Sequence, residues 1–214
     1  MQRQARDVER REHEARQLAL AAQLQALQAR TNPHFLFNSL NTVASLIPTD
    51  PELAELTLVR LAELFRYALH VSTRSRVTLD EELDATRDYL RVESLRLGDR
   101  LRWEVDVQAG LERVPTPPLL LQPLVENAIV HGVSRERSGG TVRVVVRAEP
   151  RDVVFEVHDD GSGRSDRVGT GTALDDLRKR LELCYGGRAQ LERKVGDGHV
   201  VCVRIPREEG LCAR

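Results

Sequence analysis

Apolar residues in the first hundred positions of the chain recur every three or four residues, which is the spacing of one helix face. The clearest of these faces follows Asn32-Pro33, a pair that favours a helix start, and it comprises Leu36, Leu40, Val43 and Ile47. The turn at residues 48–52 ends this helix and begins another, with Asp50 as the cap and Pro51 in the first turn. The apolar face of the second helix comprises Leu53, Leu56, Leu61, Leu64, Phe65 and Ala68.

These two helices are predicted to form an antiparallel hairpin, because the turn between them is short. One hairpin cannot bury both apolar faces, so we expect two copies to pair in a four-helix bundle, which makes the chain a homodimer. Ahead of the hairpin, residues 1–30 are charged and rich in Gln and Ala, with Leu20, Leu24 and Leu27 at helical spacing. This segment is predicted to be the end of a long helix that forms a coiled coil, with a solvated charged helix or a frayed end as the alternative for residues 1–15.

The period of the pattern changes near residue 98. Thr78 and Glu81 match a capping box, and the helix that they begin, residues 79–97, ends before Gly98 as its cap. Residues 101–107 then alternate apolar and polar, which predicts a half-buried strand. We therefore predict a helical dimerisation region over residues 1–97 and a second domain over residues 98–214.

The second domain is predicted to mix helices and strands. A loop over residues 115–118 leads into a helix at residues 119–132, and another helix covers residues 173–187. Strands are predicted at residues 141–148, 153–159, 189–195 and 199–206, the last two as a hairpin around a Gly-Asp-Gly turn. The predicted fold class is therefore α+β, with a helical hairpin first and a sheet-containing domain after it.

Composition removes several classes of function. The net charge of −1 argues against nucleic-acid binding and against a polybasic membrane anchor. No run of apolar residues is long enough to span a bilayer, and the N-terminus has no apolar signal region. Lysine occurs only at positions 179 and 194, neither of which follows a GxxxxG, so a P-loop is excluded. The scattered cysteines, without a CxxC pair, predict a reducing, cytoplasmic compartment and no structural zinc.

Three stretches of the second domain carry residues suited to nucleotide chemistry. In LVENAIVHG, residues 124–132, Asn127 and His131 share a helix face, and an Asn oxygen suits Mg²⁺ beside phosphates. In VHDDGSG, Asp159 precedes two glycines and can accept a hydrogen bond from an amine such as that of adenine. In VGTGTALDD, residues 168–176, glycines precede a helix start, where an anion is favoured. Each stretch alone is usually only a turn, but their order along the chain is much more specific.

Taken in this order, the motifs resemble the catalytic core of sensor histidine kinases of the LytS/YehU type, over residues 20–207. NPHFLFNSLN, residues 32–41, resembles the phosphoacceptor box of that family, and LLLQPLVENAIVHG, residues 119–132, resembles its N box. DDGSG and GTGTAL resemble its two glycine boxes. The resemblance implies a Bergerat-type (GHKL) α/β sandwich that binds ATP, autophosphorylation of His34, and phosphotransfer to an aspartate of a response regulator, commonly one with a LytTR DNA-binding domain.

The resemblance also implies roles for single residues in the second domain. Asn127 would bind the Mg²⁺ of ATP and Asp159 would bind adenine, while Gly161, Gly163, Gly169 and Gly171 would shape the nucleotide pocket and its lid. The family usually has a lysine or similar polar residue at the position of Val130, and His131 is the candidate substitute for that phosphate contact. Direct nucleic-acid binding is not implied, and a link to a membrane would run through a sensor region or partner outside this sequence.

The chemistry of His34 agrees with the role of phosphoacceptor. A neutral imidazole has a nucleophilic lone pair, and the ordinary pKa of histidine, about 6.5, leaves much of it neutral at cellular pH. Orientation is therefore needed more than activation. Asn38 lies four residues further along the same helix face, where its side chain can hydrogen-bond the second ring nitrogen. Read alone, His34 would be interpreted as a packed helix histidine; within this motif we interpret it as the phosphoacceptor.

Two alternatives remain open at this point. Val130, Ala173 and the pair Asp175-Asp176 depart from the family pattern, and Asp160 adds another negative charge, which favours a degenerate, kinase-like dimeric scaffold with weak or no ATP turnover. The second alternative is an ATP-hydrolysing machine of the Hsp90 or MutL kind. That class carries its general-base Glu four residues before the Asn, a position held here by Pro123.

Overall fold

The computed structural model describes residues 33–71, 74–161, 172–196 and 198–207, whose contacts divide the chain into two compact units, Met1–Ser72 and Thr73–Arg214. The predicted domain boundary lay near residues 97–100. By its contacts, however, the helix at residues 79–97 belongs to the second unit, because it packs against the next strand and the following helix. The functional division at residue 97 stays a prediction, as does the coiled coil, which lies outside the described residues.

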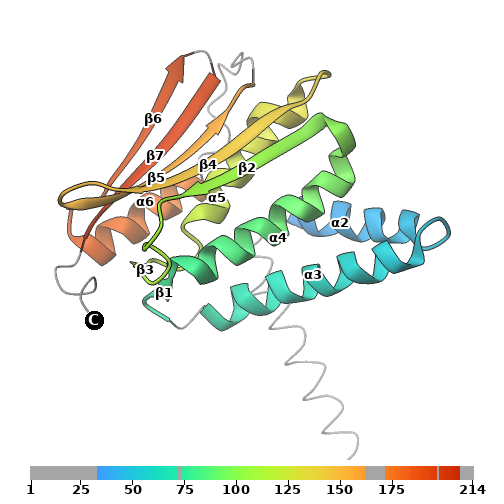
Figure 1. The fold of residues 1–214 in the computed structure, drawn as a ribbon, viewed down its shortest axis with the longest axis horizontal. Helices are drawn as coiled ribbons and strands as arrows, with labels where there is room; N and C mark the ends of the chain where they lie inside the picture. The colour runs from blue at the N-terminus through green and yellow to red at the C-terminus, as the bar shows by residue number, and fades with distance from the viewer. Residues whose placement is uncertain (1–32, 72–73, 162–171, 197, 208–214) are drawn as a thin grey trace, which may run out of the picture. The chain divides into compact units, whose positions relative to one another are not determined.

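The first unit is a hairpin of two helices, α2 (Pro33–Leu46) and α3 (Pro51–His70) (Figure 1). Asp50 begins α3 as predicted, because its carboxylate accepts a hydrogen bond from the backbone N–H of Leu53 at 3.0 Å. The buried side chains of α3 repeat at helical spacing and are Ala54, Thr57, Leu61, Leu64 and Ala68.

The buried face of α2 differs from the predicted one. Phe35, Ser39 and Val43 are buried, whereas Leu40 and Ile47 keep 44% and 59% of their surface exposed. A polar residue occupies the middle of the buried face because the hydroxyl of Ser39 donates to the carbonyl of Phe35 at 2.8 Å. The apolar pattern of α2 is therefore divided between a covered and an uncovered side.

The second unit is built on a five-stranded sheet in the order β2-β4-β5-β7-β6. Its strands are β2 (Leu101–Val107), β4 (Gly140–Ala148), β5 (Asp152–Asp159), β6 (Gln190–Gly196) and β7 (Gly198–Pro206). Only β2 and β4 are parallel neighbours, and the other pairs are antiparallel. The sequence predicted all five strands to within one residue at each end, and residues 101–107 from their alternation. A further antiparallel pair, β1 (Val77–Thr78) with β3 (Pro115–Thr116), lies in part of the predicted loop.

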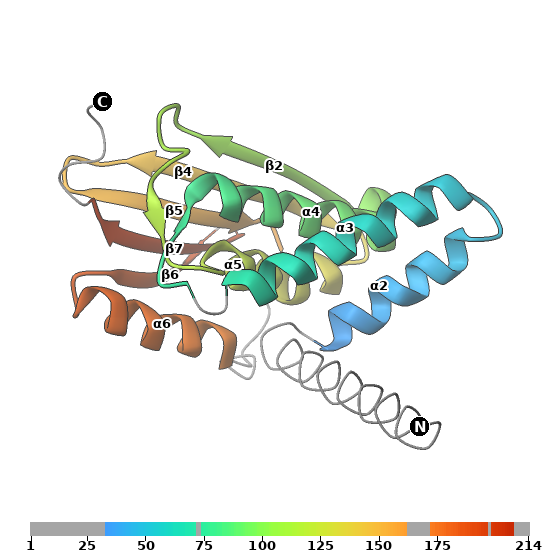
Figure 2. The same ribbon diagram turned by 90° about the horizontal axis from the view of Figure 1, so that it is seen from below.

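Helices cover one face of this sheet. They are α4 (Leu79–Leu97), α5 (Leu121–Asn127) and α6 (Thr172–Tyr185), and both views show them on the same side (Figures 1 and 2). The core between the layers is formed by alternate residues of the central strands, which are almost fully buried: Val142, Val144, Val146, Val153, Phe155, Val157, Val201, Val203 and Ile205. The predicted capping box of α4 is present, with Thr78 and Glu81 each bonded to the other's backbone N–H.

The predicted helix at residues 119–132 is not a single regular helix. After α5 the chain continues as a π-helix, η3 (Ala128–Gly132), and a 3₁₀ turn, η4 (Val133–Arg135), while a second 3₁₀ turn, η2 (Gly98–Arg100), precedes β2. Leu119 lies outside the helix because its φ is +53°, which no regular right-handed helix allows. None of the helices within the described ranges is long and apolar enough to cross a bilayer.

Candidate functional site

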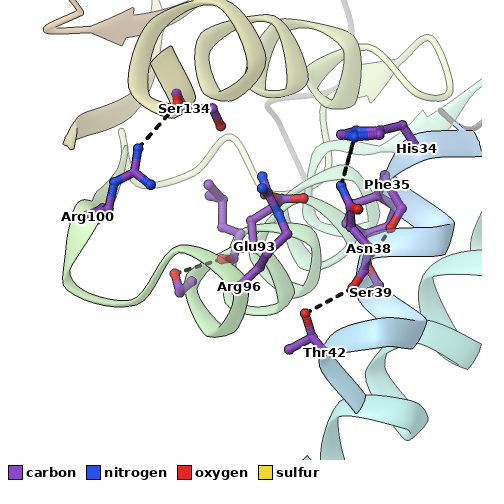
Figure 3. Close-up of polar contacts among 11 residues, drawn as sticks. His34, Phe35, Asn38, Ser39, Thr42, Glu93, Arg96, Arg100 and Ser134 are labelled. Atoms are coloured by element: carbon purple, nitrogen blue, oxygen red, sulfur yellow. Dashed lines mark hydrogen bonds and ion pairs between the residues drawn. The ribbon is translucent and has the colours of Figure 1, made fainter. Parts of the chain in front are cut away.

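His34 occupies the first turn of α2, with its side chain exposed. The amide nitrogen of Asn38, one turn later, lies 3.1 Å from Nδ1 and 3.2 Å from Nε2 of the imidazole (Figure 3). This one amide nitrogen lies almost equally far from both ring nitrogens, so the contact restrains the orientation of the imidazole and assigns the proton to neither nitrogen.

Asp159 ends β5, and only 6% of its surface is exposed. Its Oδ1 accepts a hydrogen bond from the N–H of Gly161 at 3.2 Å and lies 3.4 Å from Nδ1 of His199 on β7. Burial raises the pKa of this carboxyl above its ordinary value, and His199 and the Gly161 N–H act in the opposite direction. A nearly buried carboxylate with few partners is suited to accept a hydrogen bond from a ligand amine.

Glycines bring η3 into direct contact with this carboxylate. A Cβ added to Gly132 would lie 2.3 Å from Oδ1 of Asp159, and one added to Gly161 would lie 2.7 Å from the Cα of Gly132. The end of the N box and the first glycine box therefore meet with no side chain between them. The π-helix that ends at Gly132 is a feature often found at functional sites.

His131 lies next to this contact, on η3. Its Nδ1 is 3.2 Å from a guanidinium nitrogen of Arg135, which can only donate, so Nδ1 accepts and Nε2 carries the proton. Burial, followed by the positive charges of Arg135 and Arg193, lowers the pKa of His131. The imidazole is therefore a neutral donor beside positive charge, a suitable environment for an anion.

The structure thus brings part of the predicted site together. Asp159 and Gly161 meet Gly132 directly, and the charge of Asp159 acts on His131. Asn127, the last residue of α5, is half-buried one position before η3. Gly163, Gly169 and Gly171 lie outside the described residues.

Three residues of this site escaped the sequence interpretation: Gly132, Arg135 and His199. Gly132 closes the N box and Arg135 lies four residues after His131, so both left a local signal. His199 lies 40 positions from Asp159 in the sequence, and only the pairing of β5 with β7 makes them neighbours.

The negative charges that depart from the family pattern have partners of their own. Oδ1 of Asp160 accepts from the backbone N–H of Thr141 at 2.6 Å, which ties it to the start of β4. Asp175 and Asp176 form ion pairs with Arg178 and Lys179 on the same helix, at 3.1 and 3.6 Å. Their charge is therefore largely compensated on the surface of α6.

Comparison with known proteins gives matches over both units. Residues 22–101 match the family model described as Histidine kinase, and residues 117–209 match the one described as Histidine kinase-, DNA gyrase B-, and HSP90-like ATPase. The chain is similar to the Sensor protein LytS of Staphylococcus haemolyticus, with 34% identity over 86% of this chain and 34% of that protein. It is also similar to LytS of Bacillus subtilis, with 34% identity over 88% of this chain and 34% of that protein.

The Sensor histidine kinase YpdA of Escherichia coli is a third relative, with 32% identity over 92% of this chain and 36% of its own length. The chain therefore spans about a third of the length of these relatives. Among solved structures, the histidine kinase domain of a blue-light activated kinase from Erythrobacter litoralis aligns with a TM-score of 0.50 and 17% identity, over 91% of this chain and 95% of that domain. This last likeness shows a shared fold.

Proposed function

This chain carries the catalytic core of a LytS-type histidine kinase, and from that premise we propose that it transfers the γ-phosphoryl group of ATP to its own His34 and then to an aspartate of a response regulator. The observation that carries the proposal is the environment of Asp159, a nearly buried carboxylate against which Gly132 and Gly161 pack without side chains. Such a carboxylate can discriminate a base that donates an exocyclic amine, as adenine does.

The residues around Asp159 fit a nucleotide. Asp159 accepts from the adenine amine, and Gly161, which has no side chain, lets the backbone after β5 pack closely against Gly132 and the Asp159 carboxylate. Asn127 offers an oxygen to Mg²⁺, which supplies charge neutralisation at the phosphates when bound. His131 donates through Nε2 to a phosphate oxygen, with Arg135 adding positive charge nearby. Gly163, Gly169 and Gly171 remain proposed members of the same pocket.

His34 is the nucleophile of this proposal. The ring nitrogen with the free lone pair attacks the γ-phosphorus, so that a phosphorus–nitrogen bond forms while the bond to the ADP oxygen breaks, and the other ring nitrogen releases its proton to solvent. Asn38 holds the ring through its amide at 3.1–3.2 Å, which limits the rotation of the nucleophile before attack. In the second step an aspartate carboxylate of the regulator attacks the same phosphorus, and the histidine leaves as neutral imidazole once it has taken a proton.

We also propose that the helical hairpin pairs with a second copy. Large apolar side chains of the hairpin are 44–62% exposed, namely Phe37, Leu40, Ile47, Leu56, Leu58 and Val59. Phe37 and Leu40 lie on α2 and Ile47 directly follows it, which gives the three- and seven-residue spacing of a helix-pairing seam. The proposed partner is a response regulator with a LytTR domain. The proposed location is cytoplasmic, because phosphotransfer from ATP takes place where ATP is present.

Incubation with γ-labelled ATP and Mg²⁺ tests this function. The wild type should acquire an acid-labile label, and His34→Gln and Asn127→Ala should acquire none. A His34→Gln protein that labels as well as the wild type would remove His34 from the mechanism. A wild type that dimerises and fails to label would support the scaffold alternative.

A further inference from the structure

Glu82, on α4, has a carboxylate that none of the proposed chemistry uses. The residue is 2% exposed, and it accepts hydrogen bonds from three consecutive backbone N–H groups. Oε1 accepts from Leu119 at 2.5 Å, and Oε2 accepts from Leu120 at 2.8 Å and Leu121 at 3.1 Å. These N–H groups precede or begin α5, so one side chain from α4 supplies the acceptors that a helix start lacks.

Arg180, on α6, holds the same segment through its carbonyl groups. Its two terminal nitrogens donate to the carbonyl oxygens of Pro118 at 2.6 Å and of Leu119 at 2.9 Å. The C=O and N–H of one trans peptide point in opposite directions. The peptide groups 118–119 and 119–120 are therefore each held by Arg180 through the carbonyl and by Glu82 through the amide.

The backbone between these two side chains is strained. Leu119 has a φ of +53°, the one positive φ of a non-glycine residue among the described residues. A branched side chain disfavours this region, which persists only where the surroundings determine it strongly. A strained backbone costs stability. Because two helices hold it in place here, its geometry indicates a functional role.

The segment lies at the start of the nucleotide-binding helix. α5 runs only from Leu121 to Asn127, so a shift of its first turn moves Asn127 with it. Asp159 lies on β5 and depends on the sheet instead. The two proposed nucleotide contacts thus lie on different elements, and Asp159 meets the segment that follows α5 through Gly132.

We propose that Glu82 and Arg180 are positioning residues, which fix α5 so that Asn127 reaches the metal of a bound Mg²⁺–ATP. This inference rests on the proposed function. It predicts a specific loss: the contact between Asn127 and the metal weakens, while the contact between Asp159 and adenine is retained. A purely structural role would lower the folded fraction and leave the properties of the folded protein unchanged.

The test measures nucleotide affinity of the full chain with and without Mg²⁺ for Glu82→Gln and Arg180→Met. Glu82→Gln keeps the shape but replaces one acceptor by an amide that cannot accept, and Arg180→Met keeps the length but loses both donors. For each variant, the Mg²⁺-dependent gain in ATP affinity should fall about tenfold or more, in line with the loss of one charge-supported contact. The affinity for adenosine, which reports Asp159 alone, should stay within about twofold.

Matched controls come from the same two helices. Asp84→Asn removes an exposed carboxylate of α4 that pairs with Arg87, and Arg178→Met removes an exposed guanidinium of α6 that pairs with Asp175. Both variants should keep the wild-type gain in ATP affinity on addition of Mg²⁺. Arg180→Lys, which keeps one donor nitrogen, should retain part of this gain.

The outcomes separate this inference from the proposed function. A wild type that binds neither ATP nor adenosine contradicts the proposed function. A wild type that binds both, with folded Glu82→Gln and Arg180→Met proteins that retain the full effect of Mg²⁺, contradicts the positioning role alone. If Glu82→Gln does not fold, Arg180→Met decides, because its side chain is half-buried at the edge of the segment.

Discussion

His34 lies exposed in the first turn of a helix, whereas Asp159 ends a central strand with 6% of its surface exposed. His34 is oriented by Asn38, four residues away on the same helix. Asp159 is surrounded by Gly132, Gly161 and His199, which come from three separate elements. This difference suits the proposed roles: a phosphoacceptor must be reached by two partners in turn and stays open to solvent, while an adenine acceptor gains specificity by being taken out of water.

The two units also differ in what their surfaces leave uncovered. The helical hairpin exposes a series of large apolar residues, although its inner face is well packed. The sheet unit buries nearly all of its large apolar residues, and Leu183 is the one described exception that is strongly exposed. This contrast supports the proposed association through the hairpin, since the large apolar residues that it leaves uncovered have few counterparts on the described part of the sheet unit.

The largest effect is expected at Gly132, where two segments of the proposed nucleotide site meet. Gly132→Ala places a Cβ 2.3 Å from Oδ1 of Asp159, so the carboxylate or η3 must move. We expect ATP affinity to fall about 100-fold or more, as for loss of a buried hydrogen bond to a charged group, while the hairpin keeps its helicity and dimerisation. Titration of a fluorescent ATP analogue measures this.

The control for that variant is Gly196→Ala, since a Cβ on Gly196 would meet no atom within 4 Å. It should bind ATP as the wild type does. An unchanged affinity in Gly132→Ala would show that the contact between η3 and Asp159 has no part in the site.

The second effect concerns the uncovered side of the hairpin. Phe37→Ser combined with Ile47→Ser removes two side chains that are 62% and 59% exposed in the single chain, so folding of the hairpin should change little. In a symmetric dimer each change occurs twice, and loss of apolar burial should weaken association about 30-fold or more. Sedimentation measures the dimerisation constant, and ATP affinity should be unaffected.

Leu183→Ser is the matched control, because Leu183 is 86% exposed on α6 of the sheet unit. It removes as much exposed apolar surface from the other region and should leave dimerisation intact. Equal weakening by both changes would contradict a seam on the hairpin.

A third, smaller effect separates orientation of His34 from its reactivity. Asn38→Ala leaves the nucleophile in place but removes the amide at 3.1 Å from Nδ1. We expect kcat for autophosphorylation to fall about tenfold, with KM for ATP within about twofold, since positioning acts on the chemical step. Asn41→Ala, an exposed neighbour on the same helix, should match the wild type. A rise in KM at constant kcat would instead assign Asn38 to nucleotide binding.

These expectations also show which features could be predicted from the sequence. The caps at Asp50 and Thr78 and the pairing of His34 with Asn38 depend on residues three or four positions apart, so the spacing alone predicted them. The strands were also predicted, that at residues 101–107 from alternation, because one face of the sheet is covered by helices and the other is largely polar. The helix caps, the contact of His34 with Asn38 and the strands were therefore predicted correctly.

Features that depend on distant residues were missed. Leu119 takes its positive φ because Glu82 and Arg180, 37 and 61 positions away, hold its peptide groups. His199 reaches Asp159 only through the register of β5 with β7. Ser39 is buried because its hydroxyl is satisfied by its own helix, which a hydrophobicity pattern does not record. The first two features depend on tertiary contacts, whereas the third depends on a local hydrogen bond within α2.

The smallest expected effect tests whether the buried site lowers stability for the sake of binding. Burial raises the pKa of Asp159 above its ordinary value of 3.8, so the charged carboxylate opposes folding at neutral pH. Asp159→Asn should therefore raise the free energy of unfolding at pH 7, on the order of 1 kcal/mol, although ATP binding is lost.

The pH dependence gives this last prediction its sharpest form. As pH falls from 7 through the raised pKa, the folded wild type binds a proton before the unfolded chain does, so its stability rises relative to Asp159→Asn. The difference between the two proteins should shrink as pH falls through the raised pKa and vanish only below about pH 3, where the folded and the unfolded wild type are both protonated. Urea denaturation at several pH values measures the difference, with Asp160→Asn as the control, because the carboxylate of Asp160 is exposed and bonded to the N–H of Thr141. A constant difference between pH 4 and 7 would mean that the charge of Asp159 has no cost, and the contrast between an open histidine and a desolvated carboxylate would then rest on geometry alone.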